Sequence, residues 1–122
     1  MAAPNIVAVT SIYGKTMGAA LGTTTTTDIL TCPGNKVLKI NTIIVANVDG
    51  TNAADATVYF WDNSAGARYA LASTIGVPAD TSIVVIDKNS SIYLDEADQI
   101  EAGASASGDL VITISYEEID DA

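Results

Sequence analysis

The sequence predicts an all-β fold, in which residues 1–122 form a single-domain antiparallel β-sandwich or jelly roll of about eight strands. Val, Ile and Thr dominate most segments, and these β-branched residues favour strands over helices. Turn-forming Gly, Pro, Asn and Asp recur about every ten residues, which is the strand spacing of a sandwich. The length of 122 residues fits one domain. A closed up-and-down barrel is the minor alternative.

Alternating apolar residues predict the first strand at residues 6–13, which Gly14 ends. Residues 15–22 are then the only place for a helical turn. The run of threonines suits an extended strand, so the second strand is expected at residues 24–31. Residues 1–15 are also expected to act as an extended arm that adds a strand to a neighbouring molecule, because a polar start precedes an alternating apolar run.

The longest predicted strand covers residues 36–48, between Pro-Gly-Asn at 33–35 and the turn signal Asp-Gly at 49–50. Strict alternation gives this strand two faces. The better core candidate is the face that carries Leu38, Ile40, Thr42, Ile44, Ala46 and Val48.

Six shorter strands are predicted in the rest of the chain, at residues 56–62, 68–75, 82–87, 92–94, 100–104 and 110–116. The segment 82–87 is a continuous apolar run, which is typical of a buried strand. The last strand alternates, with Leu110, Ile112 and Ile114 on one side. Residues 117–122 are expected to form an acidic tail that frays.

The charge is one-sided, with 15 acidic residues against 5 basic ones and a net charge of −10. Electrostatic binding of DNA or RNA needs a basic surface, so nucleic acid is excluded as a partner. Only 16% of the residues are charged. Covering a surface with few long charged side chains costs little conformational entropy, which suits a subunit whose faces become buried.

The chain has no histidine and a single cysteine, Cys32. A disulfide framework, a zinc site of Cys and His, and a Ser–His–Asp triad therefore all lack their residues. We expect no enzyme activity, no cofactor and no metal. Residues 1–5 lack the pattern of a signal peptide, and no apolar run is long enough to span a membrane. The chain is therefore expected to be made in a cytoplasm and to have no membrane partner.

Three further motifs are better explained by structure than by chemistry. The acidic corner at residues 95–98, with Glu101 beyond it, has oxygen ligands that suit Ca²⁺. It lacks the spacing and the glycine of an EF-hand loop, so a solvated corner is favoured. Residues 103–108 lack the glycine–serine pattern of a nucleophile elbow. Cys32 is expected to pack as a small apolar side chain.

Tyr59, Phe60, Trp61 and Tyr69 lie close together in sequence around one predicted hairpin. Because side chains alternate along a strand, Tyr59 and Trp61 share a face and are suited to anchor a protein–protein contact. Ordinary core packing on both faces is the alternative. With the apolar residues of the N-terminal arm, the predicted interface residues are Ile6, Val7, Val9, Tyr13, Tyr59, Trp61 and Tyr69.

Seven stretches of the sequence carry a family resemblance. They are MAAPNI (1–6), IYGKT (12–16), KINTIIVANVDG (39–50), VPAD (77–80), IYLDE (92–96), ASASGDL (104–110) and SYEEI (115–119). The chain resembles small virion structural proteins of tailed bacteriophages, most closely those of contractile-tailed phages of marine cyanobacteria. The likeness runs along nearly the whole chain and includes no catalytic motif, so it implies a class and no functional residues. One departure is Ala97, where such proteins often have glycine in the corner before Asp98.

The resemblance implies a particle component present in many copies, first of all a capsid decoration (cement) protein. Such a protein binds the outer capsid surface at joints between major capsid subunits and stabilises the shell, commonly as a trimer. The expected partners are the major capsid protein and further copies of this chain. The expected location is the virion, after synthesis in the bacterial host cytoplasm.

Two alternatives remain open. A tail, collar or baseplate component is the alternative within the virion. A carbohydrate-binding β-sandwich on the particle surface, which stacks sugars on Trp61, Tyr59 and Tyr69, is the alternative from another class.

Overall fold

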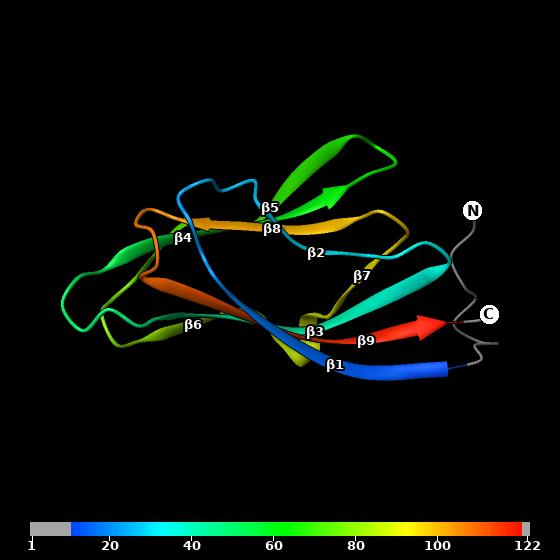
Figure 1. Ribbon diagram of the computed structural model, residues 1–122, viewed down its shortest axis with the longest axis horizontal. Coiled ribbons are helices and arrows are strands. Elements are labelled where there is room, and N and C mark those ends of the chain that lie inside the picture. Colours follow the sequence, from blue (N-terminus) through cyan, green and yellow to red (C-terminus); the bar gives the residue numbers. More distant parts are fainter. Residues whose placement is uncertain (1–10, 121–122) are drawn as a thin grey trace.

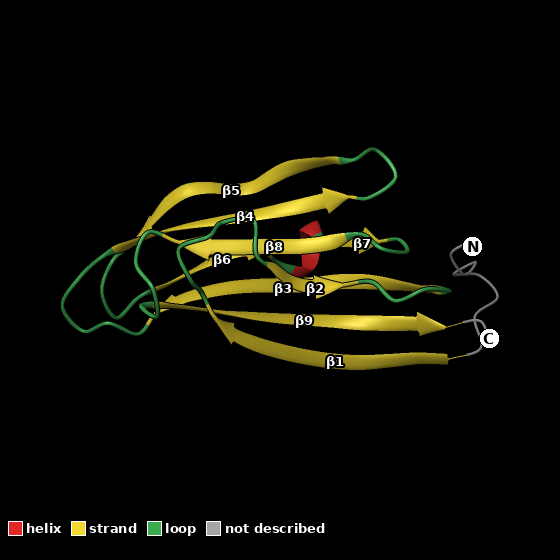
Figure 2. Ribbon diagram, turned by 45° about the horizontal axis from the view of Figure 1, so that its top comes forward, coloured by secondary structure: helices red, strands yellow, loops and turns green. Residues whose placement is uncertain are grey.

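The computed structural model describes residues 11–120, which form nine strands in two antiparallel sheets that face each other (Figure 1 and Figure 2). Sheet A contains, in order across the sheet, β1 (Ser11–Ala20), β9 (Leu110–Asp120), β3 (Lys36–Asn47) and β6 (Ser82–Ile86), with β7 (Ile92–Leu94) paired to another part of β3. Sheet B contains β2 (Asp28–Thr31), β8 (Gln99–Ala104), β4 (Ala54–Asp62) and β5 (Ala67–Val77). The single helix of residues 11–120 is a short 3₁₀ helix, η1 (Lys88–Ser90). The prediction of an all-β sandwich is confirmed.

The strands pair in a nested order: β1 with β9, β2 with β8, β3 with β6 and β7, and β4 with β5. This order results when one long antiparallel hairpin rolls up so that its strand pairs alternate between two sheets, which is the connectivity of a jelly roll. Within residues 11–120 no ladder joins sheet A to sheet B. A closed barrel is therefore wrong for this part of the chain.

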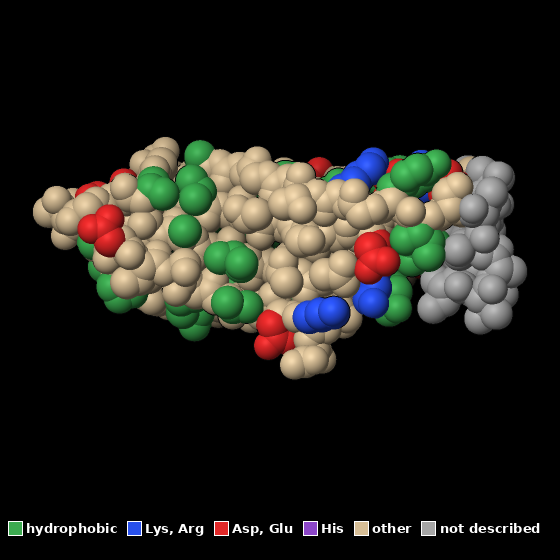
Figure 3. All heavy atoms as spheres, turned by 90° about the horizontal axis from the view of Figure 1, so that it is seen from below, with side chains coloured by type: hydrophobic (Ala, Val, Ile, Leu, Met, Phe, Trp, Pro, Cys, Tyr) green, Lys and Arg blue, Asp and Glu red, His purple; other side chains and the backbone are tan. Residues whose placement is uncertain are grey.

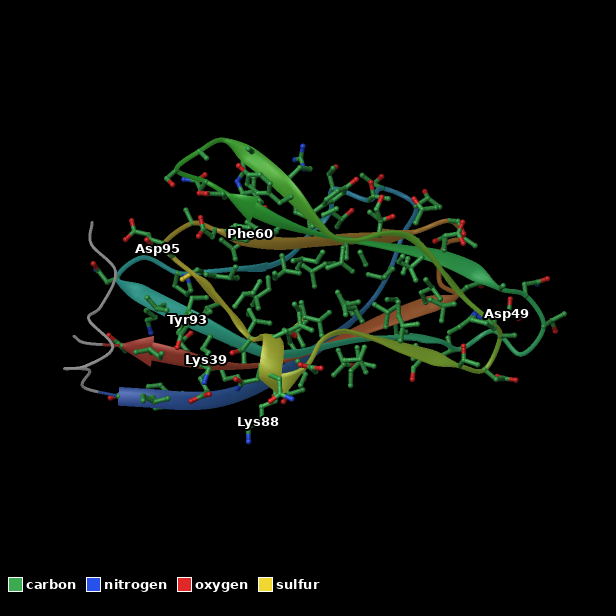
Figure 4. The ribbon with its side chains drawn as sticks, turned by 180° about the vertical axis from the view of Figure 1, so that it is seen from behind. Lys39, Asp49, Phe60, Lys88, Tyr93 and Asp95 are labelled. Atoms are coloured by element: carbon green, nitrogen blue, oxygen red, sulfur yellow. The ribbon has the colours of Figure 1, made fainter. Side chains whose placement is uncertain are left out.

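The core fills the space between the two sheets, because side chains alternate along each strand and the apolar set faces inward (Figure 4). Its fully buried side chains include Ile40, Ile43, Val45, Ile112 and Ile114 of sheet A and Val58, Ile100 and Ala102 of sheet B. Burial of each Ile or Val side chain stabilises the folded state by about 1.5–3 kcal/mol relative to leaving it exposed. This layer is what holds the outer faces of both sheets in place.

β3 turns its predicted core face inward over only part of its length. Leu38 and Ile40 are buried as predicted, whereas farther along Ile43 is buried and Ile44 is exposed. The register against β9 shifts just after Ile40, where β3 contains one extra residue, Asn41. Such a bulge exchanges the two faces of a strand, so simple alternation predicted the wrong face for the second half.

The N-terminal strand differs from the prediction. β1 continues through Gly14 to Ala20, so residues 15–20 form strand and not a helical turn. All ten residues of β1 pair with β9 in one register, and this nonlocal pairing overrides the local signals. Residues 11–15 therefore belong to the protein's own sheet A and not to an arm. The predicted contact residues Ile6, Val7 and Val9 lie outside the described residues.

The threonine run forms a turn and not a strand. The amide of Thr27 donates to the carbonyl oxygen of Thr24 at 3.3 Å, and so does its hydroxyl at 2.8 Å. β2 therefore begins only at Asp28. The short side-chain hydroxyl supplies the hydrogen bond that makes Thr and Ser compatible with turns, which the β-propensity of threonine concealed.

Residues 117–120 are not a frayed tail, because β9 continues through them. Glu118 is buried, and its carboxylate lies 3.3 Å from Lys15 Nζ and 3.2 Å from Lys36 Nζ. Two of the five basic residues of the chain thus hold the end of β9 against its neighbours.

β6 is an edge strand and not the buried strand that its apolar sequence predicts. It pairs with β3 on one side, and Val84 is 59% exposed, whereas Ile86 at its end is buried. Its outward side chains extend the outer face of sheet A.

Candidate interaction surface

The β4–β5 hairpin divides its aromatic residues between two faces. Trp61 lies opposite Arg68, and Phe60 lies opposite Tyr69. Residues opposite each other in an antiparallel pair share a face. Phe60 packs against the core (Figure 4), so Tyr59 and Trp61 point to the outer face of sheet B. The prediction that these two residues share a face is confirmed.

Tyr69 belongs to the inward face, on the opposite side from Tyr59 and Trp61. Its ring stacks with that of Phe60, with a centroid distance of 6.3 Å and an interplanar angle of 22°. The three aromatic residues therefore cannot form one stacking platform, and that prediction is wrong. The cause is the hairpin register, which places Tyr69 opposite Phe60 and not opposite Trp61.

Arg68 lies over the two outer rings and also contacts a carboxylate. Its guanidinium carbon is 4.9 Å from the centroid of the Trp61 ring and 6.0 Å from that of Tyr59, which are cation–π distances. Its Nε donates to Glu101 Oε1 at 2.8 Å, and its Nη2 donates to Glu101 Oε2 at 3.4 Å. This two-point contact fixes the orientation of the guanidinium plane. Tyr59, Trp61, Arg68 and Glu101 are called the aromatic–arginine cluster below.

Glu101 anchors the cluster from β8, where it lies opposite Tyr59 of β4. It is only 5% exposed, and a buried carboxylate is costly unless it is paired and hydrogen-bonded. Arg68 provides that partner, and in return the hydrogen bond from Arg68 to Glu101 raises the pKa of the guanidinium above its usual value. The two charges cancel, so the cluster has no net charge.

The cluster is suited to recognition. Tyr, Trp and Arg are the residue types enriched at the energetic centres of protein interfaces. Arg68 is already held by three neighbours before any partner arrives, so binding would cost little additional side-chain entropy. The arrangement offers aromatic rings and the hydrogen-bond donors of a guanidinium group.

Sequence reasoning found Tyr59 and Trp61 but missed Arg68 and Glu101. Alternation within one strand is visible in the sequence, whereas the pairing of β4 with β8 is not. The length of the turn between β4 and β5 is the feature of the sequence that could have indicated Arg68. Turn length sets the register of a hairpin, and the register decides which residue of β5 lies opposite Trp61.

Tyr13 lies away from the cluster, on sheet A. It is opposite Glu118 of β9, which directs it to the inner side of that sheet near the end of the sandwich, where it is 52% exposed. Of the predicted contact residues that the structure describes, only Tyr59 and Trp61 come together.

The acidic corner has a structural role. Asp98 Oδ1 accepts from the amide of Asn63 at 2.9 Å, and Asp98 Oδ2 accepts from the amide of Asp95 at 3.0 Å. Glu96 Oε2 accepts from the amide of Asn35 at 3.1 Å. The corner thus ties three loops together. No group of three or more His, Cys, Asp or Glu side chains suited to a metal ion occurs among residues 11–120.

The outer face of sheet A is a second broad surface with little charge. Its outward residues follow from the ladders: Thr16, Gly18 and Ala20 of β1, Val111, Thr113 and Ser115 of β9, Ile44 and Ala46 of β3, and Val84 of β6. Lys39 and Glu117 are charged neighbours toward one end of this face, and Tyr93 lies beside Lys39 (Figure 4). Figure 3 shows uncharged side chains over most of this side of the molecule.

Cys32 is buried beside the core, as predicted. It is 2% exposed, and its Sγ lies 3.2 Å from the carbonyl oxygen of Lys36. Burial raises the pKa of the thiol to about 11. A thiol that stays protonated is a poor nucleophile, so the surroundings of Cys32 suit a packing side chain.

Comparison with known proteins identifies no family for this chain: no protein-family model matches it, and neither does any curated protein. In the part of the chain that the structure describes, no helix is both long and apolar enough to cross a membrane.

Proposed function

We propose that the chain is a structural protein of a tailed-phage virion, first of all a capsid decoration (cement) protein that binds the outer capsid surface at joints between major capsid subunits. The aromatic–arginine cluster is the surface with which it would dock on the major capsid protein. The observation that carries this proposal is the position of Arg68, held between the rings of Trp61 and Tyr59 and the buried carboxylate of Glu101.

The geometry favours a protein partner. A cluster whose charges cancel can be covered without leaving an unpaired ion in the interface, and an unpaired ion is the main penalty for burying charged groups. The rings of Tyr59 and Trp61 are partly covered by Arg68 already. Arg68 thus occupies part of the surface that a sugar ring would stack on, and Tyr69 lies on the other face of the sheet, so we do not propose carbohydrate binding.

The sequence resemblance supports a virion role, and the jelly-roll connectivity agrees with it. Jelly rolls are common in viral capsid domains, but one fold serves many functions, so the fold by itself is only an analogy. A decoration protein would stabilise the shell because it binds in many copies. Each copy would contribute an interface of about 800 Å² per partner, and many such contacts together would resist expansion of the capsid. The net charge of −10 favours solubility and opposes nonspecific aggregation of free copies.

Particles of the phage that encodes this chain provide the first test. Cryo-EM of the intact virion should show the sandwich on the outer shell, in hundreds of copies, at the joints between major capsid subunits. Density at the tail, collar or baseplate, in far fewer copies, would support the alternative location. Absence of the chain from purified particles would refute both.

Binding to particles assembled without the protein tests the docking surface. Trp61→Ala should weaken binding by about thirtyfold or more, since truncating an interface centre costs about 2 kcal/mol or more. Tyr93→Ala is the matched control, because Tyr93 is a half-exposed tyrosine on the outer face of sheet A. Equal binding of Trp61→Ala and the unmodified protein would exclude the cluster as the docking surface.

A further inference from the structure

Within residues 11–120 the two sheets end in several edge strands, and all but one of them are protected against pairing with another chain. β2 is four residues long. β5 carries register shifts around Val58 of β4 and a residue with positive φ, Thr74. The edge formed by β6 and β7 is divided by η1, which Asp87 caps. Short length, bulges and interruptions are the devices that keep sheet edges from associating.

β1 has none of these protections. It pairs with β9 over ten residues, from Ser11 opposite Asp120 to Ala20 opposite Val111, without a register shift. It contains no proline and no acidic residue, and its one charged residue, Lys15, is already paired with Glu118. β1 is the last strand of sheet A within residues 11–120 (Figure 2). Alternate N–H and C=O groups of an edge strand point away from its neighbour, where they can pair with a further strand.

We propose that the free edge of β1 pairs with β1 of a second copy of this chain, antiparallel and about a two-fold axis at Thr16, so that sheet A continues across both molecules. This pairing gives a dimer, in place of the trimer that the family resemblance implies. The contact is independent of the proposed docking on a capsid, because it uses sheet A and can be measured on the purified protein.

The ladders select a second copy and this register. A two-fold axis perpendicular to a sheet keeps each face of the sheet on its own side, so inward residues lie opposite inward residues. Since side chains alternate along β1, this requires one residue at the axis to lie opposite the same residue of the second copy. An axis at Lys15 would place two lysines opposite each other, which is unfavourable. An axis at Thr16 places Lys15 opposite Met17.

The same axis also matches side-chain sizes. It places Tyr13 opposite Ala19 and Ile12 opposite Ala20, so each large side chain meets a small one on its own face. Both large residues are about half exposed in the single chain. Although two copies repel each other through their net charge of −10, β1 brings no carboxylate of its own to the contact.

A disulfide at the axis tests the register. Opposite residues of an antiparallel pair have Cα atoms about 4.5–5.5 Å apart, which suits a disulfide. Thr16→Cys should therefore form a covalent dimer of twice the chain mass of 12.5 kDa on mild oxidation. Cys32 does not compete, because it is buried and its pKa is raised to about 11. Thr113→Cys is the control, since Thr113 is exposed on the same face but lies on β9.

A charge exchange provides a second readout that does not depend on oxidation. Thr16→Glu and Thr16→Lys should each be monomeric in native mass spectrometry, because like charges meet at the axis. An equal mixture of the two should recover dimers that contain one chain of each kind. Circular dichroism of each variant monitors the fold.

Several results would overturn the proposal. They are a monomeric unmodified protein at about 1 mM, a trimer in place of a dimer, equal cross-linking of Thr113→Cys and Thr16→Cys, and a charge-exchange mixture that stays monomeric.

Discussion

Replacing Gly103 with alanine should destabilise the protein strongly, because a methyl group has no room at this position. Gly103 lies in β8 opposite Thr57 of β4, and the chain at Thr24 and Thr25 crosses over it. A Cβ atom at position 103 would be 2.6 Å from the carbonyl oxygen of Thr24 and 2.6 Å from the Cα atom of Thr25. Since carbon atoms pack best at about 3.5–4.0 Å, the crossing backbone would have to move by about 1 Å.

The crossing segment cannot move freely, because hydrogen bonds hold it to β8 on both sides. The amide of Ala104 donates to the carbonyl oxygen of Gly22 at 2.8 Å, and the amide of Ala102 donates to that of Thr27 at 3.0 Å. Overpacking costs about 1–3 kcal/mol, and losing one of these hydrogen bonds adds about 1 kcal/mol. The free energy of unfolding should therefore fall by about 2–4 kcal/mol.

Urea unfolding measures this loss as a lower midpoint with an unchanged m-value. Gly22→Ala is the control in the same segment, because a Cβ atom there would have no atom within 4 Å. We expect its stability to stay within about 1 kcal/mol of the unmodified protein. If Gly103→Ala unfolded at the same urea concentration as the unmodified protein, the packing of Thr24 and Thr25 on β8 would be refuted.

Three further predictions concern the acidic corner and Cys32. Ala97 has a φ of +68°, a conformation that glycine adopts more easily than alanine. Ala97→Gly should therefore increase the free energy of unfolding by up to about 1 kcal/mol and raise the urea midpoint; a lower midpoint would contradict this. Asp98→Ala removes the acceptor of two loop amides and should cost about 2–3 kcal/mol, whereas Asp28→Ala at an exposed position should change little. Burial raises the pKa of Cys32 from 9.0 to about 11. Because the unfolded thiol ionises first, stability should fall between pH 9 and 11 by up to about 2–3 kcal/mol, and an equally steep fall in Cys32→Ala would argue against this cause.

The strand content was predictable from the sequence because it depends on local composition. Apolar and β-branched residues between turn signals correctly indicated β3 to β8 to within a few residues. The errors occurred where a partner strand decides the outcome. Asn41 is a bulge because of its pairing with β9, and residues 15–20 are strand because β9 provides a ladder for them. Neither partner can be identified from the local sequence.

The candidate site likewise contains residues that the sequence could place and residues that depend on strand pairing. Alternation placed Tyr59 and Trp61 on one face, since that depends on a single strand. Alternation alone does not place Tyr69, Arg68 and Glu101, because their positions depend on how β4 pairs with β5 and β8. The hairpin register places Arg68, and not Tyr69, beside the rings of Tyr59 and Trp61. The three-ring platform that the carbohydrate-binding alternative required is therefore not formed.

The two proposed contact sites share one property, which leads to a last prediction. Arg68 and Glu101 cancel within the aromatic–arginine cluster, and β1 contains only Lys15, whose charge Glu118 balances. The excess of acidic residues therefore lies elsewhere and opposes association only at longer range. Salt screens such long-range repulsion, with a Debye length of about 10 Å at 0.1 M, and leaves hydrogen bonds between strands in place. Dimerisation of the purified chain, followed by sedimentation equilibrium, should strengthen as NaCl rises from about 0.01 to 0.5 M. An interface held by ion pairs would weaken over the same range, so dissociation at high salt would show that charged groups and not strand edges hold two copies together.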